Sequence, residues 1–82
     1  MSVRFGVIGC GTAARYHADV IRGLGHRIEA VAARPGSPRL DRFVRDYGVR
    51  QVFTDWRRLI PEAGRELDAL VVAISWDQTE RL

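Results

Sequence analysis

Short apolar runs alternate along the chain with segments whose apolar residues recur at helical spacing. The apolar runs cover residues 3–8, 27–33, 51–53 and 67–75, and the last one, LDALVVAIS, is the most apolar. Such runs, without polar alternation, are typical of strands buried on both faces of a parallel sheet. The pattern therefore predicts four strands, with the last as the best central strand.

The segments between these runs carry signals for three helices. After the first run, Ala14, Ala18 and Ile21 recur at helical spacing. In the second segment, Ser37 is expected to cap a helix that Pro38 begins and Gly48 ends. The third helix is brief, begins at Thr54 or Asp55 and ends at Pro61 or Gly64, and its expected apolar residues are Trp56, Leu59 and Ile60.

The resulting order, β-α-β-α-β-α-β, predicts the α/β fold class. Strands that alternate with helices form parallel sheets through right-handed crossovers. Four such strands, in the order 3-2-1-4 with flanking helices, make one mononucleotide-binding half of a doubly wound, Rossmann-like sheet. The prediction is thus a single Rossmann-like half, truncated relative to the complete fold, over residues 1–82.

The first strand-to-helix turn, VIGCGTAARYH, predicts a dinucleotide phosphate site. Gly9, Gly11 and Ala14 satisfy the pattern G-x-G-x-x-G/A. In this pattern the first residue permits a tight turn, the second lets the backbone approach a pyrophosphate, and the third lets the helix pack closely on the sheet. The following helix directs N–H groups and its positive end at the phosphates, and Thr12 can add a hydroxyl donor. The alternative is a purely structural corner, and Cys10 is expected to be a small buried filler.

Residues after the second strand favour NADP(H) over NAD(H). An NAD site usually has an Asp or Glu about 20 residues beyond the glycines, whereas this strand ends at Ala33-Arg34. Arg34 can pair with a 2′-phosphate and stack on adenine, and Ser37 and Arg39 can extend that contact. A solvated loop arginine is the alternative for Arg34, and NAD(H) remains the alternative cofactor. The missing acid also argues against a half-domain that binds S-adenosylmethionine.

Composition and charge narrow the class of protein further. The chain has 82 residues, 46% of them hydrophobic, and its net charge of +3 comes from 13 basic residues, all arginine, scattered among 10 acidic ones. This mixed surface argues against a specific nucleic-acid interface. The absence of a long apolar run or signal-peptide pattern, together with a single cysteine, predicts a cytoplasmic protein with no membrane span.

The ordered series of motifs resembles the N-terminal domain of the Gfo/Idh/MocA oxidoreductases, the glucose-fructose oxidoreductase and inositol dehydrogenase group. The similarity covers essentially the whole chain, through FGVIGCGTAARYHADVIRGL, IEAVAAR, FVRDYGVRQVFTDWRRLI and LDALVVAIS. It implies NAD(P)-dependent chemistry on sugars, cyclitols or related hydroxy and carbonyl compounds. It also implies that Gly9, Gly11, Thr12 and Ala13 line the pyrophosphate and Arg34 the adenosine 2′ region.

Other expectations follow from where this chain departs from the family. Ser75, Trp76 and Asp77 stand where the family has Thr-Pro-Asn, near the ribose and nicotinamide, and Trp76 either stacks on the cofactor or covers an apolar edge. The family's Glu-Lys-Pro segment and C-terminal substrate domain are missing, and the chain has no lysine. We therefore expect a fragment that is catalytically incompetent alone, with no catalytic residue and no metal site. His17 is expected to be a packed or hydrogen-bonded structural histidine.

A non-catalytic module is the alternative reading of the same residues. Without a neighbour, one side of the fourth strand becomes an unpaired edge, which can pair with a second copy or another chain. Such a module would bind nucleotide or a protein partner.

Overall fold

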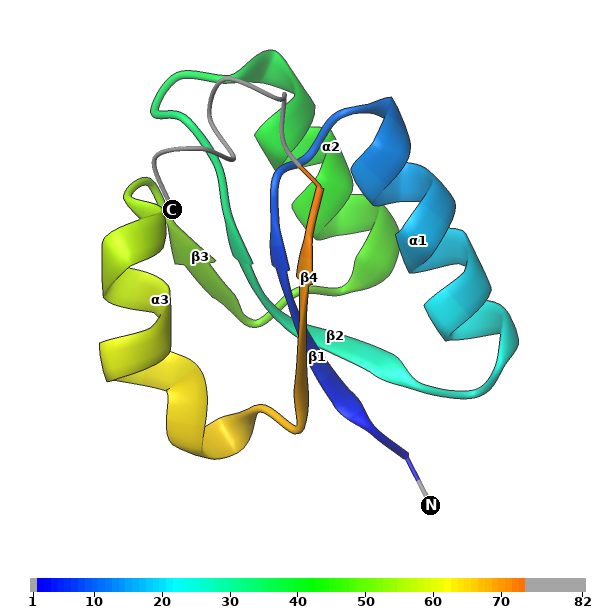
Figure 1. Ribbon diagram of the computed structural model, residues 1–82. Helices are drawn as coiled ribbons and strands as arrows, with labels where there is room; N and C mark the ends of the chain where they lie inside the picture. Colours follow the sequence, from blue (N-terminus) through cyan, green and yellow to red (C-terminus); the bar gives the residue numbers. More distant parts are fainter. Residues whose placement is uncertain (1, 74–82) are drawn as a thin grey trace.

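The computed structural model describes residues 2–73, which form a four-stranded parallel sheet with helices on both faces (Figure 1). The strand order is β3-β2-β1-β4. This order and the all-parallel pairing confirm the predicted Rossmann-like α/β fold. The strands are β1 (Arg4–Ile8), β2 (Arg27–Ala32), β3 (Gln51–Phe53) and β4 (Ala69–Val72); the helices are α1 (Thr12–Gly23), α2 (Pro38–Tyr47) and α3 (Trp56–Ala63), with a 3-10 turn η1 (Gly64–Glu66) after α3.

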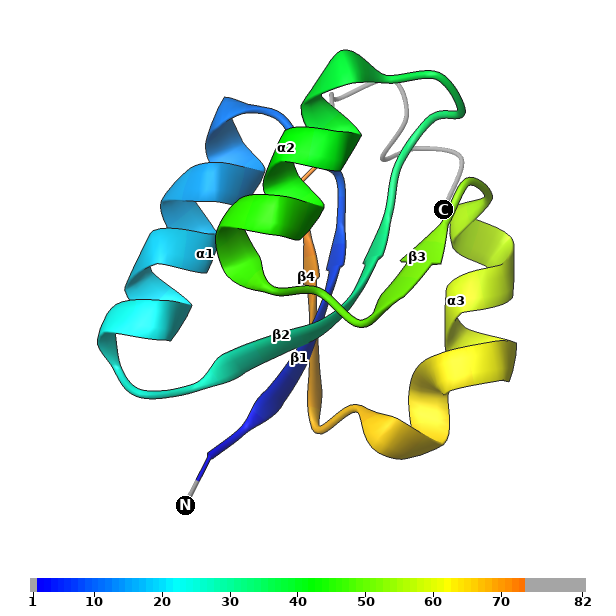
Figure 2. The ribbon, with the colours of Figure 1, turned by 180° about the vertical axis from the view of Figure 1, so that it is seen from behind.

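Two apolar layers hold the helices to the sheet. Figures 1 and 2 show α1 and α2 side by side on one face and α3 on the other. On the first face, Val7 and Val31 of the sheet pack with Ala14 of α1 and Phe43 of α2. On the second face, the sheet packs against Leu59 of α3, which is fully buried. The arrangement follows from right-handed crossovers, because the chain reverses its direction across the sheet after β3.

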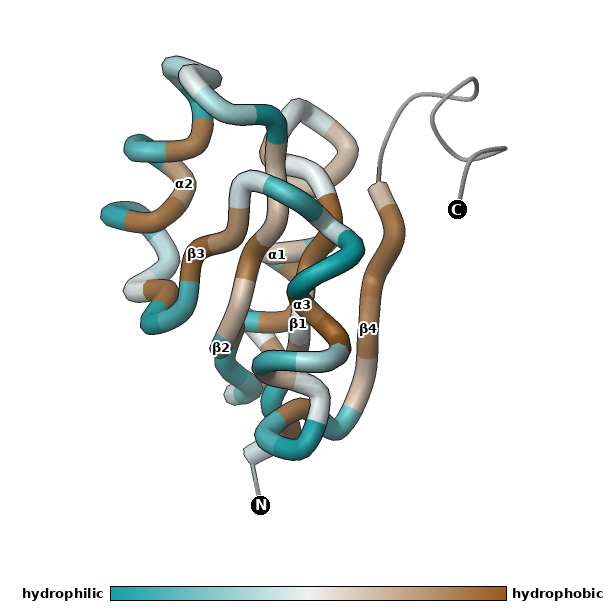
Figure 3. Tube along the Cα trace, turned by 90° about the vertical axis from the view of Figure 1, so that its left-hand side faces the viewer, coloured by the Kyte–Doolittle hydropathy of each residue, from teal (hydrophilic) through white to brown (hydrophobic). Residues whose placement is uncertain are grey.

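The fourth strand differs from its prediction in length and position. Within residues 2–73 it covers only Ala69–Val72, and it lies at an edge, paired to β1 alone. Figure 3 shows β4 standing at one border of the sheet, hydrophobic along its length. Leu70 and Val72 remain 39% and 44% exposed. The strand is apolar as expected, but in the described part of the chain it is not central.

An irregularity in the pairing of β1 with β2 buries an acidic residue. Phe5 pairs with Ile28 and Gly6 with Ala30, so Glu29 has no partner in the register, as in a β-bulge. The Glu29 carboxylate is only 5% exposed and lies 3.5 Å from the Arg27 guanidinium. This acid is therefore held inside β2, well before the strand's carboxyl end.

Two local expectations, at Ser37 and His17, are wrong. Ser37 stands at the N-cap of α2, but its side chain makes no capping hydrogen bond. The third helix carries Ile60 as expected, and this side chain is 56% exposed because α3 buries a narrow face formed by Leu59 and Ala63. His17 is exposed, and its side chain makes no hydrogen bond within residues 2–73. The centroid of its ring lies 5.7 Å from that of Tyr16.

Candidate functional site

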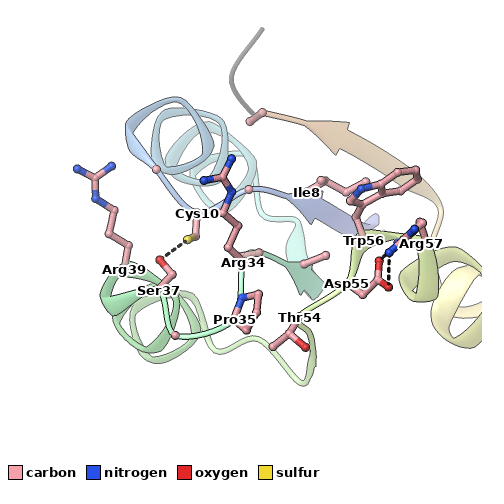
Figure 4. Close-up of a pocket in the computed structure, with 16 residues that line it drawn as sticks. Ile8, Cys10, Arg34, Pro35, Ser37, Arg39, Thr54, Asp55, Trp56 and Arg57 are labelled. Atoms are coloured by element: carbon pink, nitrogen blue, oxygen red, sulfur yellow. Dashed lines mark hydrogen bonds and ion pairs between the residues drawn. The ribbon is translucent and has the colours of Figure 1, made fainter. Parts of the chain in front are cut away.

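A pocket of about 910 Å³ opens at the carboxyl ends of β1, β2 and β3 (Figure 4). In open parallel α/β sheets, ligands bind beyond the carboxyl ends of the strands, where the strand order reverses. Here that reversal lies between β1 and β4, beside the glycine turn. The lining residues come from the carboxyl ends of the strands, the loops after them and the first turns of α2 and α3: Ile8, Gly9, Cys10, Gly11, Ala32, Ala33, Arg34, Pro35, Gly36, Ser37, Arg39, Thr54, Asp55, Trp56, Arg57 and Ala73.

The glycine turn, which connects β1 to α1, lines the pocket with Gly9, Cys10 and Gly11. Gly9 has φ +115°, a conformation that L side chains rarely adopt, and its N–H donates to the Ala32 carbonyl at 2.7 Å. Gly11 is the N-cap of α1 and leaves the turn without a side chain. No acidic residue lies in the first turn of α1, so the positive end of this helix is not compensated there. The turn has the bare backbone and positive field that a pyrophosphate requires.

The β2–α2 loop and the first turn of α2 form a polar wall, where Arg34, Ser37 and Arg39 line the same pocket. The Ser37 N–H donates to the Arg34 carbonyl at 3.3 Å, which closes a tight turn. The Ser37 hydroxyl lies 3.5 Å from the Cys10 sulfur, so this loop contacts the glycine turn through side chains. Figure 4 shows Arg34 over the pocket and Arg39 farther out, on the opposite side of Cys10 from Trp56.

The β3–α3 loop and the first turn of α3 add a third wall, which the sequence did not reveal as part of a site. Asp55 accepts hydrogen bonds from the Arg57 N–H at 3.0 Å and from the Arg57 guanidinium at 3.0 and 3.2 Å. These bonds lower the pKa of the Asp55 carboxyl. Trp56 is half-buried and packs against the apolar layer under α3 while it faces the pocket. The strand order alone could have predicted this wall. Because β3 is the parallel neighbour of β2, the segments that follow the two strands lie at the same end of the sheet.

The remaining predicted site residues lie elsewhere. Thr12 lines a neighbouring groove and not the pocket, and Ala13, in the exposed first turn of α1, lines neither. Ser75 and Trp76, like Asp77, lie outside the described residues. Cys10 is buried as expected, at 7% exposure, and also lines the pocket.

The chemistry of this pocket suits binding better than proton transfer. Its titratable side chains within residues 2–73 are those of Cys10, Arg34, Arg39, Asp55 and Arg57, and the single carboxylate among them is engaged by Arg57. Residues 2–73 contain no group of three potential metal ligands, and none of their helices is both long and apolar enough to cross a membrane. The pocket therefore offers cationic side chains, backbone N–H groups and an aromatic wall, which together fit a phosphorylated nucleotide.

Comparisons with known proteins agree with this geometry. A sequence profile of the GFO_IDH_MocA oxidoreductase family, NAD-binding Rossmann fold, matches residues 3–81. No curated protein sequence matches the chain. Among solved structures, scyllo-inositol dehydrogenase from Lactobacillus casei, determined with bound cofactor NAD(H) and scyllo-inositol, has a TM-score of 0.76 at 23% identity. The alignment covers 92% of this chain and 22% of that one. Because the profile spans almost the entire sequence, the chain belongs to the Gfo/Idh/MocA oxidoreductase family, in its NAD-binding Rossmann domain.

Proposed function

We propose that this chain is the dinucleotide-binding domain of an oxidoreductase and that it prefers NADP(H) to NAD(H). The observation that carries the proposal is the single pocket lined by Gly9, Gly11, Arg34, Ser37 and Arg39. In this proposal the turn at Gly9 and Gly11, with Thr12 and Ala13 at the start of α1, holds the pyrophosphate. Arg34, Ser37 and Arg39 hold the adenosine ribose and its 2′-phosphate.

The preference for NADP(H) is supported by the charges at the end of β2. No acidic residue lies between Ala32 and Arg39, and the side chain of Glu29 is buried beside Arg27. A ribose 2′-hydroxyl would therefore lack its usual carboxylate acceptor, whereas a 2′-phosphate would meet two guanidinium groups. NAD(H) is the alternative, because the structural neighbour was solved with NAD(H).

Within this proposal, the described residues bind and orient the cofactor and do not take part in proton transfer. When bound, the nicotinamide would supply the hydride transfer, on a sugar, cyclitol or related hydroxy or carbonyl compound. Trp56 offers an aromatic face on the adenine side of the pocket, and Ser75 and Trp76 are proposed on the nicotinamide side. The single thiol in the sequence fits a reducing compartment, so we propose a cytoplasmic location.

Thermal denaturation with NADPH, NADH or S-adenosylmethionine tests the cofactor class. A ligand that binds only the folded state raises the unfolding temperature by mass action. We expect a shift with NADPH at lower concentration than with NADH, and none with S-adenosylmethionine. An unfolding temperature that none of the three ligands changes would contradict the proposed function.

The substitution Arg34→Asp tests the side chain proposed for the 2′-phosphate. A carboxylate there repels the phosphate and can accept from a ribose hydroxyl, so NADPH should lose its advantage over NADH. Arg50→Asp is a matched control, because Arg50 is exposed and does not line the pocket. It precedes β3 and so lies at the amino ends of the strands, whereas the pocket lies at their carboxyl ends. If Arg34→Asp and Arg50→Asp have the same ratio of NADPH to NADH affinity, Arg34 does not contact the 2′-phosphate.

A second candidate function is pairing with another copy of the chain through β4. Within residues 2–73, β4 pairs only with β1, and Leu70 and Val72 are exposed beside its open edge. Such an edge is a template for another strand. Sedimentation equilibrium over a range of protein concentration tests this function. A monomer at all concentrations excludes it, and a dimer that Val72→Lys dissociates supports it.

A further inference from the structure

A second cavity lies outside the cofactor pocket, between the N-terminal halves of α1 and α2. It has a volume of about 250 Å³ and is lined by Thr12, Arg15, Arg39 and Arg42. Arg39 also lines the large pocket, so the two spaces share a wall. Because a water molecule occupies about 30 Å³ of liquid, this groove has room for a tetrahedral group of five heavy atoms.

The groove holds more positive than negative charge. Arg15 forms an ion pair with Asp46, with 2.5 Å between Nη2 and Oδ2. This hydrogen bond lowers the pKa of Asp46, and the charges of Arg45 and Arg42 lower it further. The side chains of Arg39 and Arg42 make no hydrogen bond or ion pair within residues 2–73. Asp46 is thus the one carboxylate within residues 2–73 that pairs directly with these three guanidinium groups, and Asp19 adds a weaker negative charge near Arg15.

The geometry of the neighbouring turn adds to this field. The guanidinium of Arg39 lies so near Gly11 that a Cβ there would be 3.3 Å from its Nη1. Thr12, which carries a hydroxyl, is the first residue of α1, whose first turn has no acidic residue. Cationic side chains brought together repel one another unless an anion binds among them, and the planar guanidinium group matches a phosphate in two-point hydrogen bonding.

We propose that the groove formed by Thr12, Arg15, Arg39 and Arg42 is a binding site for a phosphate group. Two sources can supply that group. One is the 2′-phosphate of a dinucleotide in the large pocket, reached across Arg39, and this source rests on the function proposed above. The other is a separate phosphate, which does not depend on it. In both cases Arg42 is a binding residue that the glycine motif and the β2–α2 loop do not identify.

Titration of the full chain with inorganic phosphate, at constant ionic strength set by chloride, tests the site directly. Heats of binding are measured for the unchanged chain, for Arg42→Ala and for Arg45→Ala. Arg45 is the matched control, because it is exposed on the same helix and does not line the groove. We expect Arg42→Ala to weaken phosphate binding about tenfold, the loss typical of one charge-assisted hydrogen bond, and Arg45→Ala to change it little.

Titration of the same variants with NADPH and NADH distinguishes the sources. If the 2′-phosphate occupies the groove, Arg42→Ala weakens NADPH but not NADH, and inorganic phosphate competes with NADPH. If a separate phosphate occupies it, Arg42→Ala leaves the affinities for NADPH and NADH unchanged while it weakens the binding of inorganic phosphate.

Two results overturn the proposal: no phosphate binding, or phosphate binding that Arg42→Ala and Arg45→Ala affect equally. Failure of both dinucleotides to bind, with phosphate binding intact, instead contradicts the cofactor function and leaves the groove as a site for separate phosphate.

Discussion

Two residues at helix N-termini make different contacts. The Asp55 carboxylate accepts the Arg57 N–H at 3.0 Å and so satisfies a free donor of α3. The Ser37 hydroxyl makes no such bond to α2 and lies 3.5 Å from the Cys10 sulfur. At this scale, Asp55 stabilises a helix, whereas Ser37 connects the two loops that face the cofactor pocket.

Substitution by alanine should separate these two roles. Loss of a capping side chain typically costs about 1 kcal/mol. We expect Asp55→Ala to lower the free energy of unfolding by about that amount, and Ser37→Ala to lower it by less than half as much. Urea unfolding of both variants measures the difference. An equal loss at the two positions would mean that the Ser37 hydroxyl caps α2 in solution.

Close packing explains why strand β1 contains a glycine at position 6. A Cβ built at Gly6 would lie 2.6 Å from Leu67 Cδ1 and 3.2 Å from Leu70 Cδ1. Gly6 also follows the register shift opposite Glu29. The absence of a side chain therefore lets the segment that leads into β4 pack closely on the sheet.

The substitution Gly6→Ala should destabilise the fold, while Gly23→Ala should not. Adding a methyl group to a packed core typically costs about 1 to 3 kcal/mol. At Gly23, the last residue of α1, a Cβ meets nothing within 4 Å, so alanine should stabilise the helix by up to about 1 kcal/mol. Thermal and urea unfolding of the two variants measures both effects. Destabilisation by both, or by neither, would contradict this account of Gly6.

The pattern of apolar residues predicted the elements better than the site. The four strands and three helices follow from periodicity and turn residues, because the helices bury one apolar face and the inner strands are apolar on both faces. The strand order follows from the alternation of strands and helices. The wall at Thr54–Arg57 was not predicted, since it depends on which strands are neighbours. The arginines of the groove are separated by up to 27 positions in sequence, from Arg15 to Arg42, and meet only when α1 packs beside α2.

Exposed ion pairs connect distant parts of the whole molecule. Asp68, before β4, accepts from the N–H and the guanidinium of Arg4 at the start of β1, and Asp46 of α2 pairs with Arg15 of α1. Hydrogen bonds from the arginines are the largest cause of the lowered pKa of both carboxyls. The folded chain therefore binds protons at these groups more weakly than the unfolded chain does.

Stability should consequently fall in acid. The contribution of these carboxylates is fully present above their unfolded pKa of about 3.9 and is lost as the pH falls through the lower folded pKa. Urea unfolding between pH 6 and pH 2.5 measures the decline, which salt should reduce because the pairs are exposed. Asp68→Asn should reduce this loss of unfolding free energy in acid. Asp41→Asn should not reduce it, because the Asp41 carboxylate forms no ion pair within residues 2–73. Equal slopes in both variants would contradict the assignment.

We expect this chain to bind a dinucleotide without catalysing a reaction. The pocket has the backbone turn and cations for a dinucleotide, but its one carboxylate within residues 2–73 is held by Arg57, and the sequence contains no lysine. The chain also spans 22% of the dehydrogenase that it resembles in fold. We therefore expect NADPH to bind without hydride transfer: absorbance at 340 nm should stay constant with NADP⁺ and inositols or aldoses as substrates. Turnover that Arg34→Asp abolishes would show that these 82 residues contain a complete active site, and that a proton-transfer group lies outside residues 2–73.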